Sequence, residues 1–90
     1  MQIIWSKRAK ASLVTIFRYI AANDPKAARN LINRLQSAIL PVTENPHMYP
    51  VGLVPGTYEI AAHRNYIIVY RVTAQRIEVV NVLHARQQYP

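Results

Sequence analysis

The sequence of 90 residues has no cysteine, only two glycines and only four acidic residues. Without cysteine the chain can form neither a disulfide framework nor a thiolate metal site, which suits a reducing compartment. It also has no Gly-rich phosphate loop, no HExxH motif and no GxSxG motif. The three histidines lack metal-ligand spacing among themselves. These absences predict a protein without a metal ion or another cofactor.

Long apolar runs are missing as well. The longest are a few residues, too short to span a membrane, and residues 1–5 lack the charged-then-apolar layout of a signal peptide. Apolar residues nevertheless make up 51% of the chain, which argues against intrinsic disorder. A chain of 90 residues has room for one core only. We therefore expect a single cytoplasmic domain over residues 1–90, with no membrane contact.

Positive charge is what the composition has in excess. Eleven Lys and Arg against four Asp and Glu give a formal net charge of +7. A small domain with this balance favours an anionic partner, either a nucleic acid or an acidic protein. The lysines all lie before residue 27, and the later part of the chain has arginines only. That distribution leaves few basic residues for a surface that binds RNA phosphates, so a protein partner is favoured first and nucleic acid second.

The first half of the sequence predicts two amphipathic helices joined by a very short linker. Ser6 is a suitable N-cap for the first helix, and apolar residues then recur at spacings of three and four. Asp24 can cap the second helix, and Pro25 fits its first turn because a missing N–H costs nothing there. The second helix is expected to reach about residue 42, with Pro41 kinking or fraying its end. The two helices form a helical hairpin over about 6–42.

The second half predicts a loop followed by strands. Residues 43–56 hold three of the six prolines and both glycines, which is typical of a connecting loop. Three runs rich in Tyr, Ile and Val follow at 57–62, 66–72 and 76–83, and the short breaks between them force antiparallel neighbours. The run 66–72 is apolar at nearly every position, so we expect the central strand there, covered on both faces. Residues 2–5 add a short strand at an edge.

These elements predict the α+β class with the order β-α-α-β-β-β. The N-terminal helical hairpin packs on a small antiparallel sheet, whose three-strand block spans 57–83. A C-terminal tail of residues 84–90 follows the last strand.

The tail and the hairpin before it carry the residue types that could do chemistry. His84, Arg86 and Tyr89 come directly after the last strand, and we expect them within reach of Arg64 and Arg71. Arginines could neutralise a scissile phosphate while His or Tyr exchanges protons with a 2′-hydroxyl and the leaving oxygen. The candidate ribonuclease set is therefore Arg64, His84, Arg86 and Tyr89. In the structural alternative, the histidine caps the strand end and the tyrosine packs its ring on the core.

The acidic residues suit structural roles. A paired-carboxylate hydrolase would have to use Glu59 and Glu78 from two different strands. The simpler interpretation is that they face solvent or pair with Arg71 or Arg76. Asp24 is best used as the helix cap already described.

Three motifs in the strand block occur together at particular spacings. They are GT-x-E at 56–59, YIIVYRV at 66–72 and VLHxR at 82–86. With the N-terminal Trp5 and the Asp24-Pro25 pair, they resemble the RelE/ParE superfamily of type II toxin–antitoxin toxins, over nearly the whole chain. The resemblance implies a growth-inhibiting toxin neutralised by an acidic, partly disordered antitoxin. It also implies that operator DNA is met only through the antitoxin.

The superfamily divides by target. RelE-like members cleave mRNA in the ribosomal A site, whereas ParE-like members poison DNA gyrase. RelE-like nucleases usually carry an arginine where this sequence has Ile67, and often a lysine-rich stretch entering the sheet, whereas this chain has no lysine after Lys26. The resemblance therefore favours a ParE-like, non-enzymatic gyrase inhibitor. The alternatives are a RelE-like, metal-independent endoribonuclease acting on ribosome-bound mRNA, and a non-toxic DNA-binding or scaffolding domain. The expected partner-binding residues are Arg64, Arg71, His84, Arg86 and Tyr89.

Overall fold

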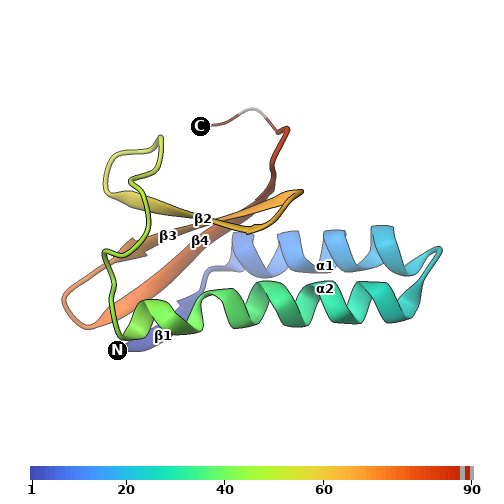
Figure 1. The fold of residues 1–90 in the computed structure, drawn as a ribbon, viewed down its shortest axis with the longest axis horizontal. Coiled ribbons are helices and arrows are strands. Elements are labelled where there is room, and N and C mark those ends of the chain that lie inside the picture. The colour runs from blue at the N-terminus through green and yellow to red at the C-terminus, as the bar shows by residue number, and fades with distance from the viewer. Residues whose placement is uncertain (88, 90) are drawn as a thin grey trace.

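The fold consists of two helices on one face of a four-stranded sheet (Figure 1). The computed structural model describes residues 1–87 and Tyr89, so Gln88 and Pro90 of the predicted tail lie outside the described residues. The elements are β1 (Gln2–Trp5), α1 (Lys7–Ala21), α2 (Pro25–Ala38), the 3-10 helix η1 (Leu40–Thr43), β2 (Thr57–His63), β3 (Tyr66–Val72) and β4 (Arg76–His84). The predicted α+β class and β-α-α-β-β-β order are confirmed.

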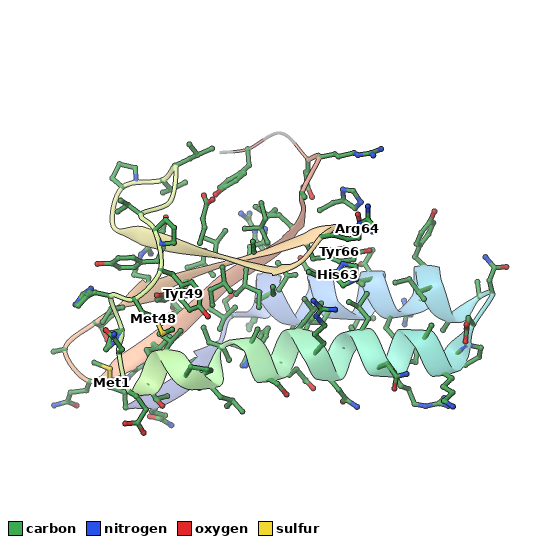
Figure 2. The ribbon with its side chains drawn as sticks, in the orientation of Figure 1. Met1, Met48, Tyr49, His63, Arg64 and Tyr66 are labelled. Atoms are coloured by element: carbon green, nitrogen blue, oxygen red, sulfur yellow. The ribbon has the colours of Figure 1, made fainter. Side chains whose placement is uncertain are left out.

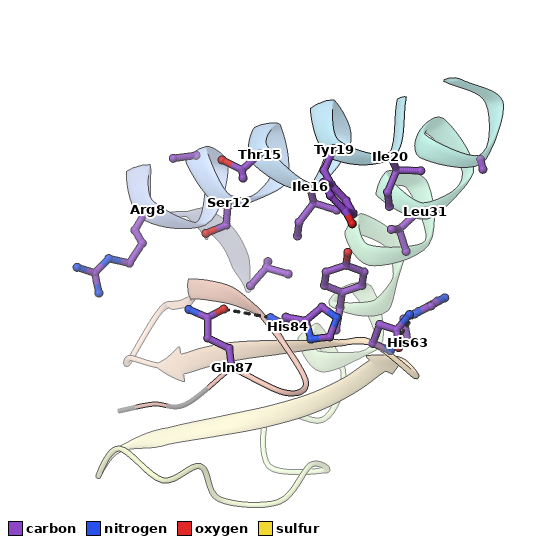
Figure 3. A pocket seen from close by; sticks show the side chains of 15 residues that line it. Arg8, Ser12, Thr15, Ile16, Tyr19, Ile20, Leu31, His63, His84 and Gln87 are labelled. Carbon is purple, nitrogen blue, oxygen red and sulfur yellow. Dashed lines mark hydrogen bonds between the residues drawn. The ribbon is translucent and has the colours of Figure 1, made fainter. Parts of the chain in front are cut away.

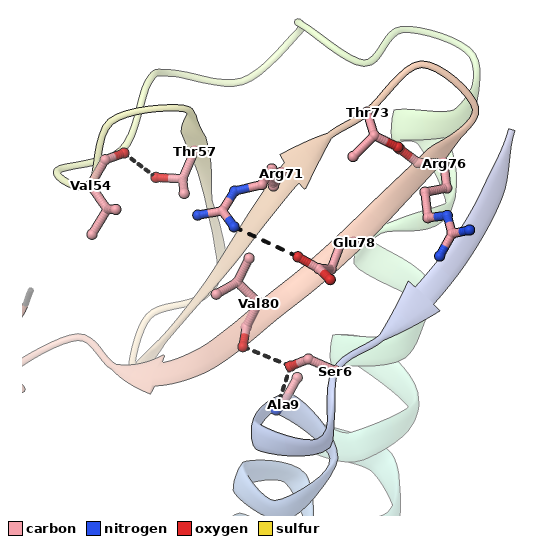
Figure 4. A network of polar contacts seen from close by, with 9 residues as sticks. All are labelled: Ser6, Ala9, Val54, Thr57, Arg71, Thr73, Arg76, Glu78 and Val80. Carbon is pink, nitrogen blue, oxygen red and sulfur yellow. Dashed lines mark hydrogen bonds and ion pairs between the residues drawn. The ribbon is translucent and has the colours of Figure 1, made fainter.

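Both predicted helix caps are present. The Ser6 hydroxyl accepts a hydrogen bond from the Ala9 N–H at 3.0 Å, and an Asp24 carboxylate oxygen accepts one from the Ala27 N–H at 3.0 Å. Such caps satisfy N–H groups that have no partner inside the helix, and each is typically worth about 1 kcal/mol. The Ser6 hydroxyl also donates to the Val80 carbonyl of β4 at 2.8 Å (Figure 4). The same side chain therefore starts α1 and fastens it to the sheet.

The second helix is shorter than predicted. It ends at Ala38, and the chain then tightens into η1, which contains Pro41. Proline has no N–H to donate, and its ring would clash with the carbonyl four residues earlier in a continuing α-helix. The 3-10 turn avoids that clash and still buries Val42 completely.

The strand order is β1-β4-β3-β2. The pairs β2–β3 and β3–β4 are antiparallel, as predicted, and β1 lies at an edge, as predicted. The edge pairing of β1 with β4 is parallel, so the sheet is mixed and not wholly antiparallel. A parallel pair needs a long crossover connection, which the helical hairpin and the intervening strands supply.

The hydrophobic core lies between the helices and one face of the sheet. Ile68 and Tyr70 of β3 are fully buried against a cluster that includes Leu35 and Ile39 of the second helix and its C-cap. Because strand side chains alternate between faces, the residues between them point away from the helices. In the part of the chain that the structure describes, no helix covers that second face. The expectation that β3 is an inner strand is confirmed, but helices cover only one of its faces. On the second face Val69 is buried, whereas Ile67 and Arg71 are half-buried.

None of the described residues forms a helix long and apolar enough to cross a membrane.

Candidate functional site

The predicted site residues lie on two sides of the sheet. Arg64, in the turn between β2 and β3, and Arg86, in the turn after β4, are brought together because the Ala85 N–H donates to the Asn65 carbonyl at 2.7 Å. His84 ends β4 beside them. We call Arg64, His84 and Arg86 the basic edge.

Arg71 and Tyr89 lie together elsewhere, so the expectation that all three tail residues are within reach of both Arg64 and Arg71 is wrong. Arg71 lies five positions along β3 from Tyr66, the partner of His84 in the β3–β4 register. Five strand residues span about 17 Å and reverse the face on which a side chain points. Arg71 and Tyr89 both line a cavity of about 400 Å³ on the second face, to which Arg8 of α1 also contributes.

This second-face cavity is mainly apolar. Val54, Val69, Val80 and Leu83 contribute to its walls. Its Arg71 guanidinium lies 3.8 Å from the Glu78 carboxylate, a pairing that the sequence predicted (Figure 4). Both side chains are about two-fifths exposed, so the pair is worth only about 0.2–1 kcal/mol. Of the two arginines that line the cavity, Arg71 and Arg8, Arg71 therefore already has a partner.

Tyr89 packs against this face of the sheet. This placement resembles the structural alternative, in which the tyrosine packs its ring on the core. Its hydroxyl is buried and has no hydrogen-bond partner among residues 1–87 and 89. The ring of His84 lines a different cavity, on the helix side, and Arg8 and Gln87 line both cavities. The phenol of Tyr89 and the imidazole of His84 therefore lie in different, adjoining cavities.

A larger groove lies on the helix side of the basic edge (Figure 3). It has a volume of about 1050 Å³ and runs between the helices and the adjoining ends of β2, β3 and β4. Ile16, Ile20 and Leu31 give it an apolar floor, and Arg8 and Gln87 lie at its margin. None of the described residues that line this helix-side groove is acidic. The groove can therefore accept apolar side chains next to negative charge.

Three rings stand in a row at the strand ends of the groove. His63 of β2 pairs with Tyr66 of β3, and Tyr66 pairs with His84 of β4. The ring centroids are 5.8 Å apart for His63 and Tyr66, and 5.4 Å apart for Tyr66 and His84. Figure 2 shows His63, Arg64 and Tyr66 together at this end of the sheet, with Met48 and Tyr49 toward the other end.

The environment of the row changes two acid–base equilibria. Burial lowers the pKa of His63 from 6.5, and the positive charges of Arg34 and Arg64 lower it further. Arg34 is placed there by a hydrogen bond from its Nε to the Ala62 carbonyl at 3.1 Å. Burial also raises the pKa of Tyr66, with a smaller contribution from the Tyr19 phenol. His63 and Tyr66 are therefore favoured in their neutral forms.

Sequence reasoning missed the groove residues His63, Tyr66 and Tyr19. The alternation of Tyr66, Ile68 and Tyr70 along β3 could have placed Tyr66 on the helix side, because period-two residues share a face. Nothing in the sequence indicates that His63 and His84 lie on either side of it, since that depends on register across three strands.

The family model described as "ParE toxin of type II toxin-antitoxin system, parDE" matches residues 3–89. The chain belongs to the ParE toxin family. It is therefore a toxin of a type II toxin–antitoxin system within the RelE/ParE superfamily, as the resemblance implied. Membership of the ParE family implies a cognate antitoxin as its partner.

Two relatives of this ParE family member are similar over almost their whole lengths. Y4kP of Sinorhizobium fredii, named as a candidate toxin, is 36% identical over 99% of this chain and 93% of its own. Toxin RelE2 of Caulobacter vibrioides is 30% identical over 93% of this chain and 94% of its own. Both names describe toxins, and one of them is RelE2.

Solved structures share the ParE-type fold. A chain of the chromosomal ParDE system from P. aeruginosa superposes with a TM-score of 0.83 at 18% identity, over 93% of this chain and 95% of that one. A YoeB/ParE toxin from Agrobacterium tumefaciens gives 0.66 at 15% identity, over 99% of this chain and 100% of that one. At these identities the similarity establishes the fold alone.

Proposed function

We propose that this toxin inhibits DNA gyrase by binding to it and is not a nuclease. The observation that carries the proposal is the separation of the predicted ribonuclease set. A general acid or base must reach the same phosphate as the arginines that stabilise it. Tyr89 lines the second-face cavity, whereas His84 lines the helix-side groove. The higher TM-score with the ParDE chain than with the YoeB/ParE toxin is consistent with this choice.

Binding uses the basic edge in this proposal. Arg64 and Arg86 are both exposed and lie in turns that are hydrogen-bonded to each other. Clustered positive charge speeds encounter with an acidic surface and fixes its orientation. The edge docks on the gyrase–DNA complex and stabilises a state in which the DNA is cleaved. An acidic antitoxin occludes the same surface in the cytoplasm, and operator DNA is reached only through that antitoxin.

The test compares purified toxin in two assays. We expect loss of gyrase supercoiling and accumulation of cleaved DNA, while ribosome-bound mRNA stays intact. The double variant Arg64→Ala with Arg86→Ala should inhibit gyrase far less, whereas Arg76→Ala, which removes an exposed arginine at the start of β4, should inhibit normally. Intact supercoiling together with cuts inside translated codons would refute the proposal.

The alternative is a ribosome-dependent endoribonuclease. One observation favours it, because Arg64, His84 and Arg86 adjoin one another at the basic edge, as that activity requires. Mapping RNA ends after induction is the decisive measurement. Codon-specific cuts that disappear in His84→Ala and persist in Tyr89→Phe would establish a nuclease that acts without the tail tyrosine.

A further inference from the structure

Two histidines close the two turns of the basic edge in the same way. Nδ1 of His63 accepts a hydrogen bond from the Asn65 N–H at 3.0 Å, and Nδ1 of His84 accepts one from the Arg86 N–H at 3.1 Å. In each turn the donor is two residues after the ring. Both rings also line the helix-side groove, on either side of Tyr66.

These bonds require one protonation state of each ring. An imidazole nitrogen can accept only when it carries no proton, so each neutral ring has its proton on Nε2. A second proton must go to Nδ1. The protonated Nδ1–H then faces a backbone N–H, two donors with no acceptor between them. The turn loses this bond, while the His63–Tyr66 strand pair and the Gln87 N–H bond to the His84 carbonyl at 2.9 Å stay in place.

The two turns are connected by backbone hydrogen bonds of Asn65. The Asn65 N–H donates to His63, and the Asn65 carbonyl accepts from the Ala85 N–H at 2.7 Å. The next residue, Arg86, donates to His84. A displacement of Asn65 therefore reaches the second turn although twenty positions separate Asn65 and Ala85 in the sequence.

Among the described residues that line the groove, no acidic side chain offsets a positive charge added to a histidine ring. The charged groups that face His63 are Arg34 of α2 and Arg64 of its own turn. On the side of His84, Arg8 of α1 lines the same groove and Arg86 follows in the same turn. The other titratable groups along the groove are Tyr19 and Tyr66, and the described lining contains no carboxylate. Protonation of His63 therefore places a cation among cations.

We propose that His63 and His84 form a proton-sensitive latch on the rim of the helix-side groove. While both rings are neutral, the turns are closed and joined through Asn65, and each ring keeps Nε2–H as a donor. Protonation of His63 removes the bond to Asn65 and loosens the rim, so any partner that packs against the two rings is held with a pH dependence. This latch is independent of whether the toxin acts on gyrase or on the ribosome.

The test is an NMR titration of the whole chain from about pH 7.5 to about pH 5, the range in which histidines titrate. At the upper limit, both imidazoles should show the Nε2–H tautomer in two-bond ¹H–¹⁵N spectra. The amide signals of Asn65, Ala85 and Arg86 should shift together as His63 titrates, with a midpoint below 6.5 because its pKa is lowered. Amides of Ala28, buried in α2, should not move.

Two variants distinguish the contribution of the His63 ring from that of its hydrogen bond. His63→Phe keeps an aromatic ring beside Tyr66 and removes the acceptor, so hydrogen exchange at Asn65 and Ala85 should become about two- to tenfold faster, the effect of losing one such bond. His63→Asn can accept the same N–H in an Asx turn but does not titrate. It should keep slow exchange and lose the pH response. An Nδ1–H tautomer at either histidine, or amides that ignore the titration of His63, would overturn the proposal, and the wild-type titration decides this even if a variant misfolds.

Discussion

Tyr58 and Tyr70 stack across β2 and β3, with ring centroids 5.3 Å apart and planes 20° apart. Tyr49 meets Tyr70 edge-on at 6.5 Å, and the Tyr58 hydroxyl lies 2.6 Å from Nδ1 of His47 in a hydrogen bond. The Tyr70 hydroxyl donates to the Pro46 carbonyl at 2.8 Å. This aromatic cluster fastens the loop between η1 and β2 to the core.

The hydroxyl of Tyr70 should contribute measurably to stability. Tyr70→Phe keeps the ring stack and leaves the Pro46 carbonyl without this donor, which should cost about 0.5–1.5 kcal/mol in unfolding free energy. Denaturant unfolding measures it. The control is Tyr19→Phe, where the side chain is 79% exposed and a change within about 0.5 kcal/mol is expected. Equal losses in the two variants would contradict the role assigned to the bond.

Tyr70 should also make stability depend on alkaline pH. Burial, followed by the neighbouring phenols of Tyr58 and Tyr49, raises its pKa from 10.0 to about 12. A group whose pKa is higher in the folded state binds its proton more tightly there. Its contribution is therefore complete below pH 10 and is lost as pH rises toward about 12. Unfolding free energies measured across this range should fall less steeply in Tyr70→Phe than in the wild type.

Local signals explain which parts of the fold were predictable. Ser6 and Asp24 act within three residues of themselves, so their caps can be recognised without knowledge of the tertiary structure. The predicted end of α2 is too late because Ile39 and Val42 continue an apolar pattern that a 3-10 turn also satisfies. The parallel direction of β1 depends on how the helical hairpin crosses the sheet, which no short motif records.

The candidate site was predictable only in part, for a similar reason. Placing Arg64 beside Arg86 followed from their positions in neighbouring turns. The error for Arg71 came from treating β3 as uniformly apolar, which hides its two faces. The His–Tyr–His row depends on pairing across three strands, so it becomes visible only once register is known.

Gly56 should tolerate few substitutions because of its backbone alone. It has a φ of +82°, and a Cβ placed on it would meet no atom within 4 Å. Gly56→Ala should therefore cost about 1–2 kcal/mol through conformation and not through a clash. Gly56→Asn should cost less, since asparagine visits this region more readily. Thermal unfolding of the two variants checks the order, and an alanine variant as stable as the wild type would contradict it.

Truncation of Leu35 should reduce growth inhibition only through loss of the fold. It is fully buried between α2 and the sheet, so Leu35→Ala should cost about 2–5 kcal/mol. A domain of this length has a total stability of only about 5–13 kcal/mol, so a substantial unfolded fraction is expected. Growth inhibition should then fall in proportion to the folded fraction measured by circular dichroism, while the exposed neighbour variant Gln36→Ala keeps both.

The double variant Arg64→Ala with Arg86→Ala should show the opposite pattern, with a wild-type unfolding curve and weak inhibition. If that double variant lost inhibition only as far as it lost its fold, the basic edge would have a structural role and no direct contact with the target.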